Sequence, residues 1–547
     1  MKGMTLCKRL GYTGTSLADA WEAHTLNHQS VTLNTKSFDF FQSELLQSNQ
    51  SASVKATVSL WDEVPNGAVL SRKKARKDIN SNPITPEKKV NVILDDENVF
   101  SNRKDSGMVL QTYNPHSYQP SEPSSSQVTI SSDEIHNVTS KYRNLFTPIN
   151  ERANAIDDKI LHLSEQIVDK HELETSPIPK PSPEETCVFG RICNTAHVGK
   201  LNSTSLVLEG SRDYSNGKRI ELKVNNIPSY SLFPGQVVAV KGYNPQGNAI
   251  ATTQIYDGVP SPYAKSRKAD LMNKKPLYIM TTSGPYTNNN QEYEPFHDFL
   301  NFVQMNRPDV VILTGPFTTC DADSDTLSNR RFYMKIISLL EDVLEEEDLK
   351  TQFVIIPSLE DEVASPVYPQ PPFSNGNVKT YKKLNLQTST LHLSHKQIHC
   401  LSNPATFSIN EVTFGVTSTD VLLHLSSEMI HLSSQNRMDC LVQHLLNQQS
   451  YYPLSPSKIP CDVTQWEKYG MAQSPDVLIV PSKLSTFCRR VKDTLVVNCG
   501  TLAKGMYGGS YADMWIFPMN KEKLESLEGD FVGHDVWDRS FVEIKKV

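Results

Sequence analysis

Hydrophobic residues in the second half of the chain gather in short runs that alternate with longer amphipathic stretches. The apolar runs are "LYIMTTSG", "DVVILTG", "QFVIIPS", "DVLIVPS" and "TLVVNCG", each ending in small residues or proline. Between them, "EYEPFHDFLNFVQM", "LSNRRFYMKIISLLEDVLEE" and "MDCLVQHLLNQQ" carry apolar residues at helical spacing. This alternation predicts strands in a sheet that is covered on both faces. We expect residues 276–547 to form one α/β domain, with "SYADMWIF" and "RSFVEIKKV" as additional strands.

Residues 184–262 have a different pattern, with five β-rich runs separated by Gly, Asn and Pro. This spacing predicts a five-stranded OB barrel, in which "IPSYSLFPG" would form a short helical plug. An OB barrel that binds single-stranded nucleic acid needs stacking aromatics over a positive groove. From residue 184 to 257, however, seven basic residues face six acidic ones, and Phe189 is the only aromatic in the first three runs. A barrel that contacts protein is therefore favoured over a strand-binding barrel, which stays the alternative.

The chain before the barrel is expected to hold little compact structure. Residues 1–50 predict short helices, and residues 51–150 are rich in Ser, Asn, Pro and Lys. Such a composition buries too little apolar surface to offset the entropy of ordering, so it predicts a disordered linker. Residues 151–173 predict one amphipathic helix.

Two kinds of short motif precede the barrel. "SRKKARK" has five basic residues in seven, which predicts a nuclear import signal, with a solvated charge run as the alternative. Four Ser/Thr-Pro pairs, expected in exposed and extended surroundings, are candidate phosphorylation sites. The basic residues are Arg72, Lys73, Lys74, Arg76 and Lys77, and the phosphorylation candidates are Thr85, Thr147, Ser176 and Ser182.

Composition narrows the class of protein. The net charge of −7 over 547 residues argues against a chain that coats nucleic acid. No apolar run approaches the roughly 20 residues of a membrane helix, so no membrane partner is expected. The first ten residues lack the apolar core of a signal peptide. Nine scattered cysteines without a C-x-x-C motif indicate reduced thiols in the cytosol or nucleus.

The turns after the predicted strands lack the residues of a two-metal phosphoesterase. Such a centre needs carboxylates, an Asn and several His at successive strand ends. The turns here contain no His, and only Glu360 and Asp361 offer carboxylates. We therefore expect no catalytic, metal or cofactor site. The degenerate turn positions are Ser283, Gly284, Gly315, Pro316, Glu360 and Asp361.

Three stretches of the chain resemble the B-subunit family of eukaryotic replicative DNA polymerases, and more narrowly its polymerase alpha–primase branch. They are "PSLEDEVASPVYPQPPF" (357–373), "LSNPATFSINEVTFGVTSTDVLLHL" (401–425) and "VNCGTLAKGMYGGSYADMWI" (497–516). With "FGRI" in the barrel, the resemblance covers residues 184–547. It implies an OB barrel followed by an inactive, degenerate metallophosphoesterase-like α/β sandwich of the calcineurin type.

The resemblance also implies a nuclear, non-catalytic scaffold subunit that supports the initiation of DNA replication. Its partners would be the zinc-bearing C-terminal domain of the polymerase alpha catalytic subunit, the primase subunits through the complex, and DNA weakly or indirectly. Tyr368, Phe373, Tyr507 and Tyr511 are candidate partner contacts, because aromatics concentrate binding energy; core packing is the alternative for each. An accessory subunit of a delta- or epsilon-type polymerase and a metal-dependent phosphodiesterase stay open as other functions.

Overall fold

The computed structural model describes residues 100–547 apart from 118–127, 134, 141, 179, 197–198, 273, 289–291, 318–325, 347–348, 362–364 and 374–395. The predicted N-terminal helices, the basic motif Arg72–Lys77 and Thr85 lie outside the described residues. Among the helices described, none is long and apolar enough to cross a membrane.

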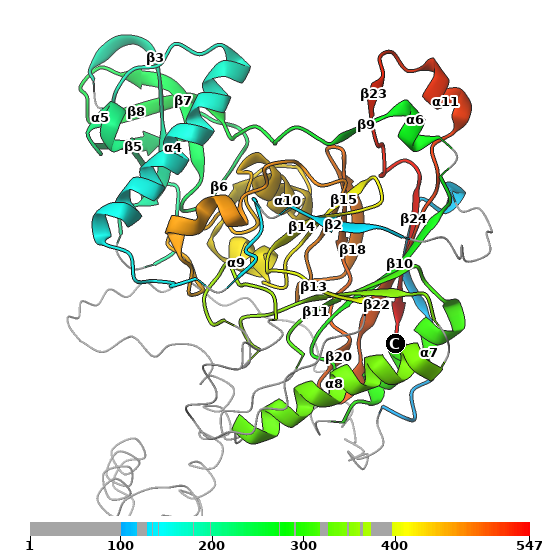
Figure 1. The fold of residues 1–547 in the computed structure, drawn as a ribbon. Helices are drawn as coiled ribbons and strands as arrows, with labels where there is room; N and C mark the ends of the chain where they lie inside the picture. The colour runs from blue at the N-terminus through cyan, green and yellow to red at the C-terminus, as the bar shows by residue number, and fades with distance from the viewer. Residues whose placement is uncertain are drawn as a thin grey trace, which may run out of the picture. The chain divides into compact units, whose positions relative to one another are not determined.

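The predicted α/β domain contains two sheets, which pack face to face. The first sheet has seven strands, of which β10 to β13 run parallel and the others antiparallel (Figure 1). In spatial order they are β1 (Val109–Tyr113), β24 (Ser540–Lys546), β22 (Ser510–Ile516), β10 (Leu277–Ser283), β11 (Val310–Thr314), β12 (Gln352–Ile356) and β13 (Ile398–Cys400).

The second sheet has six strands, with β15, β17 and β19 parallel at its centre. The expectation of a single sheet is therefore wrong: three of the five predicted apolar runs join the first sheet and two join the second. In spatial order the second sheet contains β18 (Phe487–Val491), β19 (Thr494–Asn498), β17 (Val477–Ile479), β15 (Val412–Val416), β14 (Ala405–Ile409) and β2 (Ile130–Ser132).

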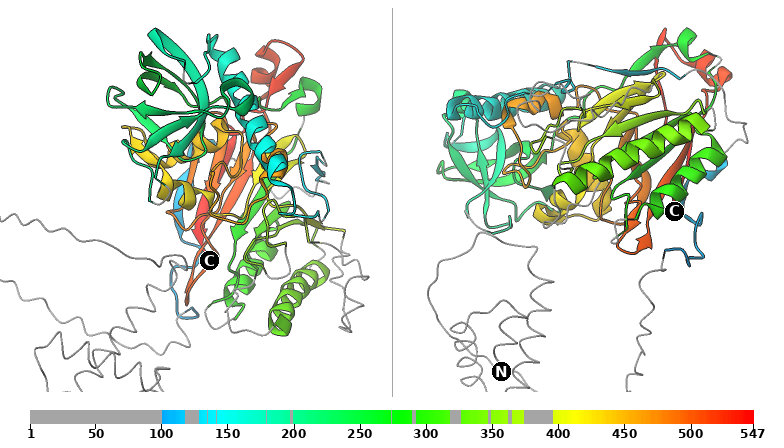
Figure 2. Two further views of the ribbon diagram at one scale, coloured as in Figure 1. Left: turned by 90° about the vertical axis from the view of Figure 1, so that its left-hand side faces the viewer. Right: turned by 60° about the horizontal axis from the view of Figure 1, so that its bottom comes forward.

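Alternation along each strand explains why these runs are apolar throughout. Val310 and Ile312 of β11 point into the core between the two sheets, while Val311 and Leu313 point into the core beneath the helices. Helices α7 (Glu294–Asn306) and α8 (Thr326–Glu346) cover the outer face of the first sheet (Figure 2). Helices α9 (Val421–Glu428) and α10 (Arg437–Asn447) cover the outer face of the second. The result is a four-layer sandwich, which we call the sandwich.

Part of the predicted disordered linker belongs to the sandwich. Strand β1 pairs with β24 and β2 pairs with β14, so both extend the sheets at their edges. Buried Asn137 adds to this attachment, because its side chain donates to the carbonyl of Thr406 at 2.8 Å and accepts from the amide of Thr406 at 2.9 Å. The prediction of disorder up to residue 150 is therefore wrong for these segments. They are edge strands with mostly exposed or half-buried side chains, and backbone hydrogen bonds hold them in place more than apolar burial does.

The predicted barrel forms from the five expected runs, and a helix packs beside it. Its closed order is β3 (Ser182–Asn194), β4 (Leu206–Glu209), β5 (Arg219–Lys223), β8 (Ala249–Tyr256) and β7 (Val237–Asn244). The helix predicted at 151–173 is α4 (Ile149–His171), whose Ile160 and Leu163 pack on Val237. Barrel and sandwich together confirm the predicted fold class.

The stretch expected to plug the barrel is a strand instead of a helix. Residues Tyr230–Leu232 form β6, which pairs with β16 (Ile430–Leu432) of the sandwich. Gln448, just after α10, strengthens this junction: its side-chain oxygen accepts from the amide of Val237 at 2.7 Å, and its nitrogen donates to the carbonyl of Val237 at 2.9 Å. The barrel is thus bonded directly to the sandwich.

The shorter elements join the strands and helices named above. They are η2 (Pro115–Ser117), α5 (Arg212–Ser215), β9 (Lys265–Arg267), α6 (Lys268–Leu271), η4 (Val463–Tyr469), β20 (Ala503–Lys504), β21 (Tyr507–Gly508), α11 (Lys521–Ser526) and β23 (Phe531–Gly533).

Two of the phosphorylation candidates are less exposed than expected. The hydroxyl of Thr147 is buried, and that of Ser176 hydrogen-bonds Thr186 Oγ1 at 2.8 Å. Ser182 begins β3, and its hydroxyl donates to the carbonyl of Glu184 at 3.0 Å. The expectation of exposed surroundings is therefore wrong for Thr147 and Ser176, whereas Ser182 lies in an extended strand with its hydroxyl at the surface.

Candidate functional site

A cleft of about 770 Å³ opens where the parallel strands of both sheets end. The turns after β10, β11 and β12 line one side of it, and the turns after β15, β17 and β19 line the other. This is the edge at which parallel α/β sheets place their ligands. The lining residues from these turns are Ser283, Gly284, Pro285, Pro316, Ser358, Leu359, Glu360, Ser418, Thr419, Asp420, Pro481, Ser482, Lys483, Thr501, Ala503 and Lys504.

Two glycines of this cleft leave no room for ligand side chains. A Cβ on Gly284 would overlap the carbonyl of Pro316, and a Cβ on Gly315 would overlap the carboxylate of Asp361 and the Cβ of Ser358. The turns after β10, β11 and β12 therefore pack against one another at the positions where a phosphoesterase would project carboxylates. The glycines are needed for this close approach.

Asp361, one of the two acids noted in the sequence, is a buried structural group. Its Oδ1 accepts a hydrogen bond from the amide of Phe317 at 2.6 Å, and its Oδ2 accepts one from the amide of Ser358 at 2.9 Å. Its carboxylate thus joins the turn after β11 to the turn after β12. Glu360 is exposed and lines the cleft, whereas Asp361 is buried.

Gln370, at the centre of the "YPQPPF" motif, is fully buried and joins three further segments. Its side-chain nitrogen donates to the carbonyls of Ser358 at 3.0 Å and Ser365 at 2.6 Å. Its side-chain oxygen accepts from Asn403 at 2.7 Å, and Asn403 in turn accepts from the hydroxyl of Thr417 at 2.9 Å. The motif that marks the family resemblance therefore supports the floor of the cleft.

Polar residues on the other side of the cleft are also engaged with the protein. Asp420 Oδ1 accepts from the hydroxyl of Ser482 at 2.6 Å, and Oδ2 accepts from the amide of Lys483 at 2.8 Å. Asn498 accepts from the amides of Ser482 and Gly500 at 2.9 and 3.0 Å. Among the residues that the structure describes, no three His, Cys, Asp or Glu side chains are grouped to hold a metal ion.

The sequence interpretation missed the positive rim of the cleft. Lys483 and Lys504 are exposed and make no ion pair with another described residue. A third lysine, Lys458, pairs with Glu428 at 2.6 Å. Burial lowers the pKa of His424, which also lines the cleft and hydrogen-bonds Tyr452 at 3.1 Å, so this imidazole is neutral at physiological pH. Only the tertiary structure brings these residues together, because they come from four separate segments of the chain.

Three of the four candidate partner contacts are core residues. Tyr368 and Tyr511 are 0% and 2% exposed, and Phe373 packs edge-on against Phe317 with ring centroids 5.9 Å apart. Core packing, the alternative stated for each, is the better explanation for these three. Tyr507 differs, since it is 65% exposed and pairs across the β20–β21 hairpin with Lys504 on the rim of the cleft.

The one aromatic residue in the first three predicted barrel strands offers no free ring for nucleic-acid bases. Phe189, the aromatic noted in the sequence, is 8% exposed and stacks on Tyr214 with ring centroids 4.9 Å apart. Its ring is therefore occupied within the protein.

Comparison with known proteins agrees with this architecture. The family of B subunits of DNA polymerases alpha and epsilon matches residues 279–489, and the OB-domain family of the DNA polymerase alpha B subunit matches residues 153–258. The DNA polymerase alpha B subunit of Schizosaccharomyces pombe is 31% identical over 480 residues, which cover 82% of this chain and 80% of that protein. The chain belongs to the B-subunit family of DNA polymerase alpha. The resemblance stated from three sequence motifs is thus confirmed.

Other members of this B-subunit family extend further than the matched part of this chain. The mouse protein is 33% identical over 396 residues, which cover 69% of this chain and 62% of the mouse protein. The aligned part of this chain therefore spans less than two thirds of the length of these mammalian relatives. Among solved structures, an archaeal phosphodiesterase is 12% identical and covers 47% of this chain and 100% of its own, with a TM-score of 0.20.

Proposed function

We propose that this chain is a non-catalytic accessory subunit of the DNA polymerase alpha–primase complex. It acts in the nucleus, binds the zinc-bearing C-terminal domain of the catalytic subunit, and supports the initiation of DNA replication. Primase joins it through the complex, and DNA contacts it weakly or indirectly. The observation that supports this proposal most directly is that Gly284, in the lining of the cleft, and the buried Gly315 have no room for a ligand side chain, because the carbonyl of Pro316 and the carboxylate of Asp361 stand against them.

The proposed lack of catalysis is supported by how the cleft is lined. Hydrolysis of a phosphodiester by paired cations needs several ligands from successive turns around an open position. Asp361, in the turn after β12, and Asn498, at the end of β19, accept hydrogen bonds from backbone amides, so their oxygens are occupied. A cleft with this lining is a concave, mostly apolar surface with lysines at its rim, and a protein partner fits it better than a substrate.

The β20–β21 hairpin is the part of the rim most suited to a partner. Tyr507 presents a large exposed ring, and Lys504 lies opposite it in the hairpin. Exposed tyrosines of this kind are enriched among the residues that dominate the binding energy of protein interfaces. A permanent contact of this subunit would bury more than about 2,000 Å², so the hairpin would be one anchor within a larger surface.

Co-expression with the C-terminal domain of the catalytic subunit tests the partner. The two should elute together from size-exclusion chromatography, and Tyr507→Ala combined with Lys504→Glu should weaken the complex at least about tenfold, as expected for an aromatic anchor. Met305→Ala removes a side chain that is 73% exposed on α7 and serves as the matched control. Separate elution of the parent proteins at micromolar concentration would refute the proposal.

The phosphodiesterase alternative is tested with the purified chain alone. We expect no manganese-stimulated hydrolysis of a chromogenic phosphodiester above that of a Glu360→Ala variant. Turnover by the parent chain that Glu360→Ala abolishes would instead establish an enzyme.

A further inference from the structure

A small two-stranded ribbon projects from the edge of the sandwich. Strand β9 pairs antiparallel with β23, and the two lie with α6 and α11 away from the barrel (Figure 1). Its inner face closes a core of its own, formed by Leu271, Met519, Leu524 and Val532. This unit belongs to neither main sheet. It is also separate from the cleft and the β20–β21 hairpin, to which we assign the binding of the catalytic subunit.

The outer face of the ribbon presents an aromatic ring and two cations. Arg267 stands directly opposite Phe531 in the register, with its guanidinium 5.6 Å from the ring centroid. Lys265 is on the same face, because side chains alternate along a strand. Phe531 is 56% exposed, and neither Lys265 nor Arg267 makes an ion pair with another described residue. The ring and both charges are therefore available to a ligand.

A buried hydrogen-bond chain holds the ribbon to the sandwich. The hydroxyl of Ser266, between the two cations, lies 2.9 Å from His534 Nε2, and His534 Nδ1 lies 2.7 Å from Asp476 Oδ2. Both His534 and Asp476 are 3% exposed, and Asp476 also accepts from the amide of Thr413 of β15 at 2.9 Å. The hydrogen bonds of this imidazole and carboxylate fix the ribbon to the second sheet. Because both groups are buried, a substrate cannot reach them.

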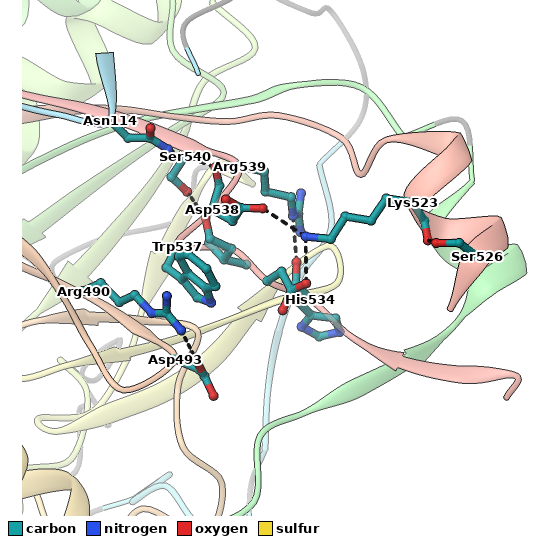
Figure 3. Close-up of polar contacts among 12 residues, drawn as sticks. Asn114, Arg490, Asp493, Lys523, Ser526, His534, Trp537, Asp538, Arg539 and Ser540 are labelled. Atoms are coloured by element: carbon teal, nitrogen blue, oxygen red, sulfur yellow. Dashed lines mark hydrogen bonds and ion pairs between the residues drawn. The ribbon is translucent and has the colours of Figure 1, made fainter. Parts of the chain in front are cut away.

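A second set of contacts fixes the same unit from its other side. Figure 3 shows Lys523 reaching from α11 toward the segment after β23, where it pairs with Asp535 at 3.0 Å and with Asp538 at 2.9 Å. The amide of Lys268 donates to the carbonyl of Asp530 at 2.9 Å, which closes the end of the ribbon. The outer face is thus held in position before any ligand binds, which lowers the cost of binding.

The β9–α6 side of this unit is basic. Residues 265–275 contain five basic residues and one acid, whereas residues 521–533, which include α11 and β23, contain two basic residues and four acids. Proteins that bind single strands combine cations along the phosphate backbone with aromatics on which bases stack. An acidic peptide would use the cations and leave the exposed ring unused, so a nucleic acid is the better match.

We propose that the outer face of the β9–β23 ribbon binds single-stranded nucleic acid, with one base stacked on Phe531 and the adjoining phosphates on Lys265 and Arg267. This inference rests on the proposed function in one respect: membership of a polymerase complex would bring template or primer strands close to the subunit. It assigns the direct contact with nucleic acid to a surface outside the barrel, although an OB fold is the domain that would be expected to make such a contact.

Fluorescence anisotropy of the whole chain with a labelled oligothymidylate at low salt tests this site. Phe531→Ala and Phe531→Leu should each weaken binding at least about fivefold, while Phe531→Tyr, which restores a stacking ring, should stay within about twofold of the parent. Replacing both Lys265 and Arg267 by Gln should lower the slope of log affinity against log salt by roughly 1.4, the value for two phosphate contacts on a single strand. Equal urea midpoints for all variants would show that each is folded.

Matched controls separate this site from general charge attraction. Lys350→Gln with Lys396→Gln removes the same charge near β12 and β13 and should leave binding within about twofold of the parent. Equal losses in that control, no binding by the parent chain, or full binding by Phe531→Ala would each overturn the proposal. So would displacement of the oligonucleotide by polyglutamate that binds independently of Phe531, which would assign the surface to an acidic peptide. Because the chain is measured alone, these results do not depend on whether it co-elutes with the catalytic subunit.

Discussion

The carboxylate of Asp361 fills the space in which a side chain on Gly315 would stand. The acid that the sequence offers as a metal ligand is thus the group that closes the neighbouring turn. Its two oxygens bind the amides of Phe317 and Ser358, which fixes the ends of β11 and β12 relative to each other. The same carboxylate therefore excludes a side chain at position 315 and forms the hydrogen bonds that join the two turns.

This relationship predicts strong coupling between the two positions. Gly315→Ala should destabilise the chain by about 1–3 kcal/mol through overpacking. Asp361→Gly should also destabilise it, since two buried amides lose their acceptor at about 1–3 kcal/mol each. The double variant should cost clearly less than the sum, because removing the carboxylate makes room for the new methyl group. Urea unfolding of the four proteins measures the coupling, and additive losses would contradict the packing described here.

Gln370 should behave as a buried hydrogen-bond centre. Gln370→Ala removes the donor to the carbonyls of Ser358 and Ser365 and the acceptor for Asn403 Nδ2, so we expect a loss of about 2–5 kcal/mol in the free energy of unfolding. Gln246→Ala, at an exposed turn position, is the control and should change stability by less than about 0.5 kcal/mol. Similar unfolding curves for both variants would remove the role assigned to the "YPQPPF" motif.

Acid should loosen the junction between barrel and sandwich. Burial lowers the pKa of His444 from its ordinary 6.5 to about 4, and its Nε2 lies 2.7 Å from the hydroxyl of Ser231 of β6. The folded state therefore binds fewer protons than the unfolded state between these values, so stability present above pH 6.5 is lost as the pH falls toward 4. The shift corresponds to about 3 kcal/mol.

A variant separates His444 from the other groups that titrate in this window. His444→Gln keeps a polar partner for Ser231 and should flatten the fall in stability between pH 6.5 and pH 4, measured by urea unfolding at several pH values. His116→Gln, at an exposed position, should retain the parent profile. An unchanged profile in His444→Gln would show that this imidazole is not the group that is lost on protonation.

The strands contributed by residues 100–140 should be needed for stability. A chain that begins at residue 91 retains β1 and β2, whereas one that begins at residue 141 exposes the edges of β24 and β14 and loses the bonds of Asn137. Unpaired edges favour aggregation. We expect the shorter chain to unfold at lower urea concentration and to be cleaved faster by protease. Equal stability of the two chains would support the original prediction of a linker.

Buried strands can be predicted from their apolar residues, whereas exposed edge strands give a much weaker signal in the sequence. Val311 and Ile312 belong to a run in which every position is buried, and such runs predicted β10, β11, β12, β17 and β19. In β1 and β2 most side chains are exposed or half-buried, so the apolar signal is weak. Their pairing depends on backbone groups of distant strands, which no local pattern contains.

By itself the sequence determined the buried strands, the long helices and the barrel, and it showed that the strand-end turns lack the usual ligands of a metal pair, because periodicity and residue type are local properties. The tertiary structure decided which sheet each strand joins, that Tyr368, Phe373 and Tyr511 are buried, and that Asp361 stands against Gly315. It also placed Phe531 opposite Arg267, more than two hundred residues away in the chain. Contacts of this kind arise from packing between distant segments, and that packing is settled only when the whole core is assembled.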